Sequence, residues 1–410
     1  MSPQTFLLLV GLAVLVLLAA RLGFGQGRLP SMLHPLVETG TVFILIGAAL
    51  GPSGANLLSP EMLEQISPIL IIGLGWVGFL YGSHLEWRLL RRYPGRMYAA
   101  TLVEAGVTFA LVYAAVWWLL GWWSEATPWS GGPLSHSTRM ATTLVLAICA
   151  AGTAPAGVFL LSRARRINQG DLNLLQFMAA LDDLPGLVLL GLSAWWLHPA
   201  APPVALAALG GAAWPLLAVG LGVGLGLTAH WLYPYLENIR HSTLILLGVV
   251  SLGAGAAASL SLSPLFVTAV GGAVFANLSQ RKESAYGLLA REEHAIYAVC
   301  LLVAGVRTHF EGGGVLLLFV LYFAARTAGK LAGGHGAVRL LRAGGTRASP
   351  LLGMGLIYQG GITLALAVSF NHIHPGQVPG SVLTALVLSV VANELLGPLL
   401  ARRMLRRTRP

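Results

Sequence analysis

Stretches of about twenty predominantly apolar residues recur along the whole chain, and they constrain its fold more than any other feature. Only 10% of the residues are charged, against roughly 25% in soluble domains. A stretch of this kind crosses a bilayer as an α-helix, because a helix satisfies its own backbone hydrogen bonds in lipid. The sequence therefore predicts an all-α polytopic membrane protein.

About thirteen spans can be placed, and the gaps between them leave no room for a soluble domain. The expected spans are 5–22, 34–52, 65–84, 97–122, 139–162, 171–197, 203–229, 241–260, 263–279, 294–309, 314–338, 349–371 and 380–401. The first span has no basic segment before it and no small-residue cleavage motif, so we expect a retained helix and not a signal peptide. Residues 1–410 are expected to form one transmembrane domain.

Basic residues follow every second span. The loops after odd-numbered spans hold nearly all of them: Arg21, Arg28, Arg88, Arg91, Arg92, Arg96, Arg163, Arg165, Arg166, Arg240, Arg281, Lys282, Arg291, Arg339, Arg342, Arg347 and the tail from Arg402 to Arg409. The opposite loops hold little beyond Arg139 and Arg307. The positive-inside rule then places the N-terminus outside and the C-terminus in the cytoplasm. The net charge of +10 reflects this topology and not a nucleic-acid partner, since the arginines are spread over many loops.

Two adjacent aspartates, Asp182 and Asp183, lie in the middle of the span 171–197. An ionised side chain at the bilayer centre costs about 2.5–3.5 kcal/mol on insertion scales, so such residues usually serve proton or cation movement. Lys330 reaches a similar depth in the span 314–338, which runs the other way. A buried cation facing two anions offsets part of their desolvation cost. Adjacent carboxylates also disfavour each other's ionisation, a property that proton-for-cation exchange requires.

Other ionisable residues within the expected spans are weaker site candidates. Arg326 shares a helical face with Lys330 and is a candidate second partner for the aspartates. Glu104 could neutralise Arg326, or it could be a protonated, hydrogen-bonded carboxyl; the sequence leaves both open. Glu38 and Glu394 are expected to be interfacial or structural.

Cofactor and metal chemistry find no support in the sequence. The two cysteines, Cys149 and Cys300, both fall in apolar spans and predict neither a disulfide nor a metal motif. We expect no cofactor, and no metal beyond a transported cation. Arginine far outnumbers lysine, and Ala, Gly and Leu dominate, which is typical of GC-rich bacterial coding and indicates a bacterial inner membrane.

Two spans are interrupted near their middle. The span 139–162 contains residues 151–157 (AGTAPAG), and the span 349–371 contains residues 358–361 (YQGG). Pro and Gly free backbone groups and break a helix there. Because the two spans run in opposite directions, they predict two inverted repeats whose discontinuous helices cross at the substrate site. The residues expected at the crossing are Thr153, Ala154, Pro155, Gln359 and Gly360.

The chain resembles the monovalent cation:proton antiporter superfamily, in particular bacterial sodium/proton antiporters with thirteen spans. Residues 179–187 (AALDDLPGL) are similar to the family's aspartate pair, and residues 328–333 (AGKLAG) to its lysine-bearing helix. The resemblance implies that Asp182 pairs with Lys330 and that Asp183 is the main carboxylate for cation and proton. It also implies that Thr153 lies at the first helix crossing, that the protein is a homodimer, and that exchange is electrogenic, with more than one proton per cation.

Three departures from the family pattern leave the ion and the stoichiometry open. Residues 359–362 (QGGI) lack an acidic residue that relatives often carry after the glycine. Pro185 follows the aspartates and is expected to bend their helix. Arg326 has no clear counterpart in the family.

The expected function is secondary active transport, not enzyme catalysis. We expect exchange of protons for a monovalent cation, sodium before lithium or potassium, in the service of pH homeostasis. Alternating access would move core helices, about 97–197 and 314–401, against scaffold and dimer helices, about 34–84 and 263–309. The lipid bilayer, the cation and the proton are the expected partners.

Four alternative functions fit the sequence less well. A potassium/proton antiporter of the potassium-efflux type is disfavoured mildly, because no nucleotide-binding domain follows the last span. A sodium-coupled organic-anion symporter of the same fold would need more Asn, Ser and Thr near the breaks. An intramembrane aspartyl protease would need its two aspartates on separate helices. A non-transporting sensor or scaffold is disfavoured by the intact Asp182, Asp183 and Lys330.

Overall fold

The computed structural model describes residues 40–58, 60–126, 134–162, 168–197, 211–233, 239–280, 282–310 and 312–407. Within these ranges all regular structure is helical. The expected span 5–22, the start of the span 34–52 and Glu38 lie outside the described residues.

The described helices follow the expected spans closely. They are α3 (Thr41–Leu50), α4 (Pro60–Gln65), α5 (Ser67–Ser83), α6 (Trp87–Leu90), α7 (Gly95–Ala126), α8 (His136–Ala151), α9 (Pro155–Ser162), α10 (Gln169–Leu181), α11 (Asp183–Trp196), α12 (Ala213–Leu232), α13 (Ile239–Ser259), α14 (Pro264–Leu278), α15 (Lys282–Val306), α16 (Gly312–Ala343), η3 (Leu352–Leu356), α17 (Gly361–Ile373) and α18 (Gly380–Arg407). Five segments of the described chain are long and apolar enough to cross a membrane, and six apolar helices of 10–17 residues accompany them. The expected all-α multi-pass class is therefore confirmed, while the count of thirteen spans stays a prediction.

Helix α15 starts earlier than its expected span, 294–309. It begins at Lys282, and only its part Ala295–Val306 is apolar. Its first turns, residues 282–294, mix charged residues with good helix formers such as Ala and Leu, so hydropathy alone does not detect them.

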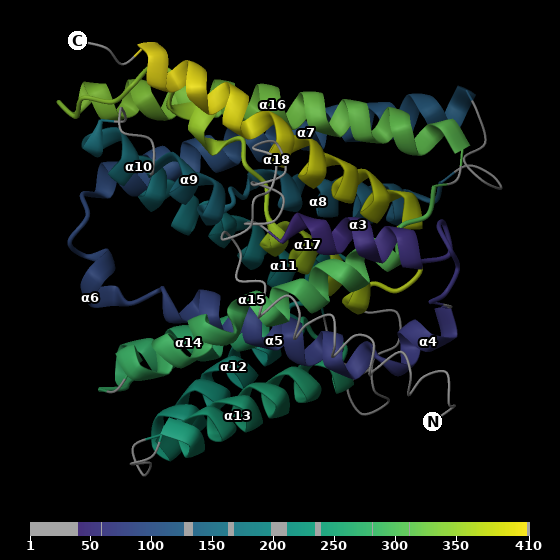
Figure 1. Cartoon of the computed structure of the whole chain (residues 1–410), viewed down its shortest axis with the longest axis vertical. Coiled ribbons are helices and arrows are strands. Elements are labelled where there is room, and N and C mark those ends of the chain that lie inside the picture. Colours follow the sequence, from purple (N-terminus) through teal and green to yellow (C-terminus); the bar gives the residue numbers. More distant parts are fainter. Residues whose placement is uncertain are drawn as a thin grey trace, which may run out of the picture.

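Both interruptions that the sequence predicts are present, and they cross. Helix α8 ends at Ala151, residues 152–154 are non-helical, and α9 begins at Pro155, where a missing N–H costs nothing. The 3₁₀ helix η3 is followed by the non-helical residues 357–360 and then by α17. The N–H of Ala154 donates to the carbonyl of Tyr358 at 3.1 Å, which joins the two non-helical segments at the centre of the molecule (Figure 1).

The aspartates lie where one long helix is interrupted. Helices α10 and α11 meet at Asp182, and together they form one apolar segment, Gln169–Trp196. Pro185 has no N–H to donate to the carbonyl of Leu181 four residues earlier, which accounts for the break at this point. The interruption therefore lies at the aspartates themselves, and the bend expected from Pro185 stays a prediction.

Two groups of helices flank the crossing (Figure 1). On one side α7 packs along α16, and on the other α5 packs against α14 and α15 while α12 covers α14. Glycines allow the close approach of α7 and α16, since a Cβ on Gly333 would lie 2.6 Å from the carbonyl oxygen of Glu104. This approach brings Glu104 of α7 against Lys330 of α16.

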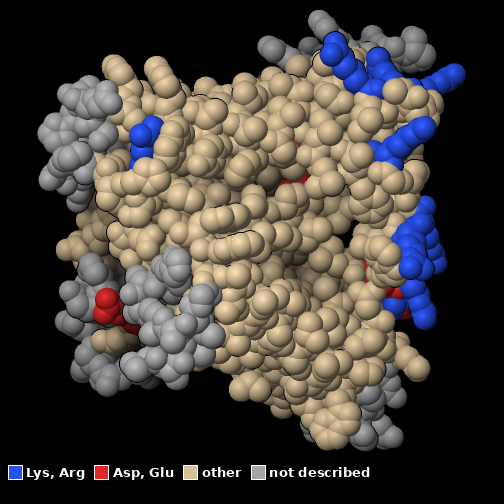
Figure 2. Space-filling view, turned by 180° about the vertical axis from the view of Figure 1, so that it is seen from behind, with Lys and Arg blue, Asp and Glu red and all other residues tan. Residues whose placement is uncertain are grey.

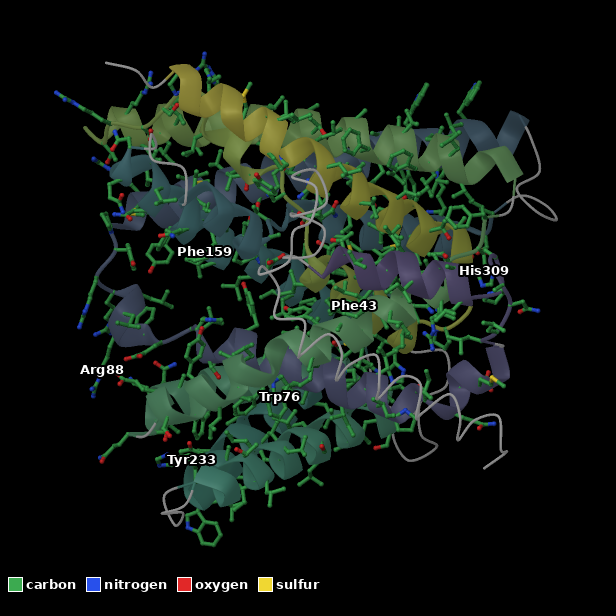
Figure 3. The ribbon with its side chains drawn as sticks, in the orientation of Figure 1. Phe43, Trp76, Arg88, Phe159, Tyr233 and His309 are labelled. Carbon is green, nitrogen blue, oxygen red and sulfur yellow. The ribbon has the colours of Figure 1, made fainter. Side chains whose placement is uncertain are left out.

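The face of the molecule drawn in Figure 2 is apolar except at its two ends. Figure 2 shows lysine and arginine gathered along one edge of a face that is otherwise almost free of charge. Leu216 and Trp231 are 73% and 66% exposed, as suits side chains that face lipid. Figure 3 places Arg88 and His309 at opposite ends of the molecule, one from each set of loops that the arginine pattern separates.

Candidate ion-binding site

Asp182 is held by the first helix break and by a lysine. The N–H of Thr153 donates to its Oδ1 at 3.1 Å, and the Thr153 hydroxyl donates to its Oδ2 at 2.5 Å. Lys330 Nζ lies 3.0 Å from the same Oδ2, and all of these side chains are fully buried. The structure thus contains the Asp182–Lys330 contact that the family resemblance implies.

Asp183 lies on a different face of the same helix, and its carboxylate has fewer hydrogen-bond partners. It is 3% exposed, and its Oδ1 has no hydrogen-bond partner. Gly152 leaves the space that this oxygen fills, because a Cβ at that position would overlap it. Adjacent helical residues point about 100° apart. Asp182 can therefore bind Thr153 and Lys330 while Asp183 lines a cavity.

Asp183 lines a cavity of about 510 Å³. Gly360 and Gly361 of the second break line it, together with Tyr81, His84, Gln176, Tyr286 and Tyr297. Phe159, another lining residue, lies on the same side of the molecule as Arg88 (Figure 3). The cavity therefore leads from the crossing toward the arginine-rich end.

Lys330 has a second carboxylate partner. Glu104 Oε1 lies 3.1 Å from its Nζ, and both side chains are fully buried. The ammonium also donates to the carbonyl of Ala151 at the end of α8, and to the Thr153 hydroxyl at 2.9 Å. From the sequence, Glu104 could neutralise Arg326 or be a protonated carboxyl. In the structure its Oε1 contacts Lys330 Nζ.

Arg326 binds the backbone at the breaks and not the aspartates. It donates to the carbonyls of Ile357 and Gly152 at 2.7 Å each, and to that of Tyr358 at 3.2 Å. These carbonyls follow the C-terminal ends of η3 and α8, where the helix dipole is negative. Arg326 thus compensates both broken helices, a role that the sequence did not reveal.

Gln359 joins the second break to three helices, α8, α16 and α18. Its Nε2 donates to the carbonyl of Cys149 at 3.2 Å and to Tyr322 Oη at 2.9 Å. Its Oε1 accepts from Ser389 Oγ and Asn393 Nδ2 at 3.0 Å each. All hydrogen-bonding positions of the amide are occupied, so the side chain positions the crossing and offers nothing to a passing ion.

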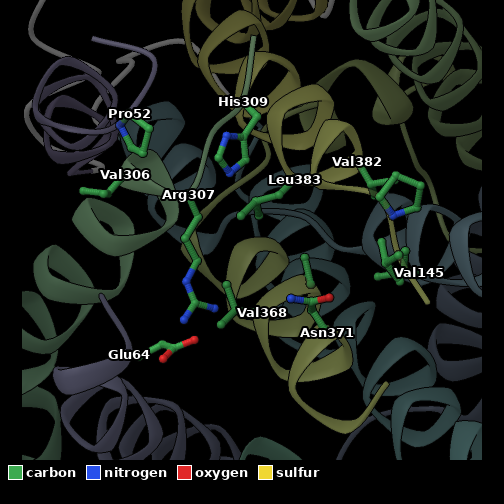
Figure 4. Close-up of a pocket in the computed structure, with 14 residues that line it drawn as sticks. Pro52, Glu64, Val145, Val306, Arg307, His309, Val368, Asn371, Val382 and Leu383 are labelled. Carbon is green, nitrogen blue, oxygen red and sulfur yellow. The ribbon is translucent and has the colours of Figure 1, made fainter. Parts of the chain in front are cut away.

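A second cavity, of about 280 Å³, is lined by His309, which lies at the opposite end of the molecule from Arg88 (Figure 3). Arg307, His309 and Asn371 line it, and Figure 4 shows Arg307 directed toward Glu64. Among the described residues that line it there is neither Asp182 nor Asp183. Asp183 is therefore reached from the arginine-rich end in this conformation.

Two further expectations concern Glu394 and the possibility of a resident metal ion. Glu394, expected to be interfacial or structural, is fully buried in α18. No group of three or more His, Cys, Asp or Glu side chains that could hold a metal ion occurs in the described part of the chain.

Comparison with known proteins gives the family. The family model described as "Sodium/hydrogen exchanger, transmembrane" matches residues 7–406. No curated protein matches the chain by sequence.

Two solved structures of the sodium proton antiporter MjNhaP1 from Methanocaldococcus jannaschii share the fold of this chain. The first, at pH 8, has a TM-score of 0.61 at 16% identity and covers 97% of this chain and 99% of that one. The second, from electron microscopy, has a TM-score of 0.57 at 15% identity and covers both chains fully, 100% each. The chain, a multi-pass membrane transporter, belongs to the sodium/hydrogen exchanger family, and its transport class is cation/proton exchange.

Proposed function

We propose that this protein exchanges protons for sodium at Asp183, with Asp182 as the neighbouring carboxylate and lithium or potassium as alternative cations. The observation that carries the proposal is the unequal state of the two aspartates. Asp182 is fully bonded to Thr153 and Lys330, whereas Asp183 has an unpartnered Oδ1 and lines a cavity. A carboxylate in this state binds either a proton or a cation, and the two compete.

The coupling follows from that competition. A cation and a proton cannot both occupy the Asp183 carboxylate, so each leaves when the other binds. The cavity is lined by α5 and α15 on one side and by α9, α10 and α17 on the other, and movement between these two groups would close it. The second cavity lies between the same two groups, with α15 on one side and α8, α17 and α18 on the other, and supports alternating access.

The setting of the proposal is a bacterial inner membrane with the N-terminus outside and the C-terminus in the cytoplasm. The arginine-rich end of the described residues, with Arg88 and the cavity of Asp183, then faces the cytoplasm. A homodimer is the expected assembly, with its contact among the scaffold helices.

Flux measurements on proteoliposomes test the proposal. A pH-sensitive dye is enclosed, a proton gradient is imposed, and sodium, lithium or potassium is added outside. The wild-type protein should dissipate the gradient, and Asp183→Asn should reduce this flux to the level of empty vesicles. Glu283→Gln removes an exposed carboxylate and serves as the matched control, with flux like the wild type. Normal exchange by Asp183→Asn would contradict the site.

The cation panel also distinguishes the alternatives. A response to potassium alone would favour the potassium-efflux type of antiporter. Organic-anion symport is disfavoured by the crossing itself, where Thr153 is bonded to Asp182 and the Gln359 amide has no free position. Sodium-dependent uptake of a labelled organic anion, without proton flux, would reverse that conclusion.

A further inference from the structure

The segment that connects α5 to α7 combines exposed arginines with exposed aromatic and apolar side chains. This connecting segment, residues 86–96 (EWRLLRRYPGR), comprises α6, the turn after it and the first residues of α7. Trp87, Leu89 and Tyr93 are 57%, 46% and 46% exposed. The arginines of the segment are also exposed: Arg88, Arg91, Arg92 and Arg96. The exchange proposed at Asp183 uses none of these side chains.

The positive charge of the connecting segment is not balanced within the described part of the chain. The one carboxylate of the segment, Glu86, is paired with Lys282 at the start of α15. Among the described residues, no carboxylate forms an ion pair with any of the four arginines. The segment therefore presents a cluster of positive charges that an anion from outside the chain can bind.

Hydrogen bonds fix both ends of the connecting segment. The N–H of Trp87 donates to Asn277 Oδ1 at 2.8 Å, and Asn277 Nδ2 donates to the carbonyl of Leu85 at 2.9 Å. Further along, the Tyr98 hydroxyl of α7 donates to the carbonyl of Leu90 at 2.5 Å. One end is thus bound to α14 and the other to α7. Figure 1 shows α6 at one edge of the molecule.

The side chains of the segment have the chemistry of a lipid-headgroup contact. The guanidinium carbon of Arg91 lies 4.7 Å from the centroid of the Trp87 ring, a stacking that orients the guanidinium. A guanidinium binds phosphate oxygens through two parallel N–H groups. Trp and Tyr favour the level of the headgroups. Arginines among exposed apolar side chains are therefore typical of a segment that lies on a membrane surface.

The membrane suits this surface better than a soluble acidic partner does. The segment joins two apolar helices, α5 and α7, so the bilayer already brings headgroups to its level. A soluble partner would lose its translational freedom on binding, whereas the lipids are present at high local concentration. Acyl chains also cover the exposed Trp87 and Leu89, which an acidic surface alone would leave in water.

We propose that the connecting segment binds anionic phospholipids of the leaflet at the arginine-rich end. Trp87, Leu89 and Tyr93 enter the boundary between headgroups and acyl chains, and the arginines bind the lipid phosphates. The contact lies beside the cavity of Asp183, because His84, two residues before the segment, lines that cavity. Bound anionic headgroups offset the positive potential that the arginines would otherwise place there, and so favour entry of a cation. This consequence for transport rests on the proposed exchange.

Quenching by brominated lipids tests the contact in the full chain. Leu89→Cys is labelled with a bimane fluorophore, while the native Cys149 and Cys300 are buried and stay unlabelled. The protein is placed in nanodiscs with equal fractions of phosphatidylglycerol and phosphatidylcholine, and only one of the two carries bromine on its acyl chains. Brominated phosphatidylglycerol should quench about threefold more strongly than brominated phosphatidylcholine. The preference should fade in about 1 M salt, where the Debye length is about 3 Å.

Two double variants separate the segment from the general charge of this end. Arg88→Gln with Arg92→Gln removes two arginines of the segment, and Arg339→Gln with Arg347→Gln removes two exposed arginines elsewhere as the matched control. Both should melt within about 2 °C of the parent in detergent, since all four side chains are exposed. The first pair should quench equally with either lipid, and the control should keep the preference of the parent.

Three quenching results would overturn the lipid contact. Equal quenching by the two lipids in the parent would mean that the segment does not choose a headgroup. Equal loss of the preference in both double variants would mean that net charge and not this segment attracts the lipid. No quenching by either lipid would place the segment in water, as a surface for a soluble acidic partner.

The consequence for transport is measured in vesicles of phosphatidylcholine alone, where no anionic headgroup offsets the arginines. The pair Arg88→Gln and Arg92→Gln should there lower the KM for sodium about two- to threefold relative to the control pair. Equal KM values would overturn the effect on cation entry. Absence of any sodium-dependent proton flux in the control pair would count against the proposed exchange itself, while the quenching result stands independently of it.

Discussion

At the scale of single residues, the site separates two jobs between adjacent aspartates. Asp182 binds the backbone and hydroxyl of Thr153 together with Lys330, and so joins the first helix break to α16. Asp183 binds no such partner through its buried Oδ1, and the residue lines the cavity. One carboxylate therefore organises the site, and the other is available for exchange.

Gly152 should be essential because it makes room for the exchanging oxygen. A Cβ at Gly152 would overlap Asp183 Oδ1, so Gly152→Ala should displace the carboxylate and abolish most cation-dependent proton flux. Gly106→Ala is the matched control, since a Cβ there meets nothing within 4 Å. The control should exchange normally and gain about 0.5–1 kcal/mol of stability within its helix. Equal activity of the two variants in proteoliposomes would show that Asp183 does not need this space.

Charged residues in apolar spans are rare enough that Asp182, Asp183 and Lys330 could be singled out from the sequence. Their partners could not, because the rotation of one helix against another is decided by packing. Glu104 meets Lys330 and not Arg326 only because α7 and α16 approach closely at Gly333.

At the scale of elements, the sequence predicts where the two helices are interrupted, but it does not predict the hydrogen bonds made at the interruptions. Gly and Pro in mid-span indicate an interruption from local chemistry alone. The bond from Ala154 to Tyr358, and the four partners of Gln359, join positions that lie far apart in the sequence. One signal was available in hindsight: Tyr322, Arg326 and Lys330 recur every four residues on one face of α16.

The packing of α7 against α16 should be sensitive to added volume at Gly333. A Cβ there would lie 2.6 Å from the backbone oxygen of Glu104, so Gly333→Ala should separate the helices and cost about 1–3 kcal/mol of stability. It should also slow exchange, since Glu104 and Lys330 move apart with their helices. Gly313→Ala lies in the same helix with nothing within 4 Å of its Cβ and is the control. Thermal unfolding in detergent, followed by flux assays, compares them; indistinguishable melting temperatures would refute the close-packing argument.

At the scale of the whole molecule, the arginine pattern predicts which end faces the cytoplasm but not which end is open. Which cavity is open depends on the free-energy difference between two packings of the same helices. No local sequence signal reports that difference. The structure shows the cavity of Asp183 at the arginine-rich end and a separate cavity at the other.

Sidedness of labelling should distinguish the two cavities in a membrane. Gln176 lines the cavity of Asp183, Asn371 lines the second one, and both residues are exposed, whereas the native Cys149 and Cys300 are buried. A membrane-impermeant thiol reagent should therefore label Gln176→Cys in everted vesicles and Asn371→Cys in right-side-out vesicles, with the parent protein unlabelled in both. The opposite pattern would invert the topology drawn from the arginines. Labelling of both variants from one side would mean that the cavities do not face opposite compartments, and alternating access between them would fail, because each cavity must serve a different side of the membrane.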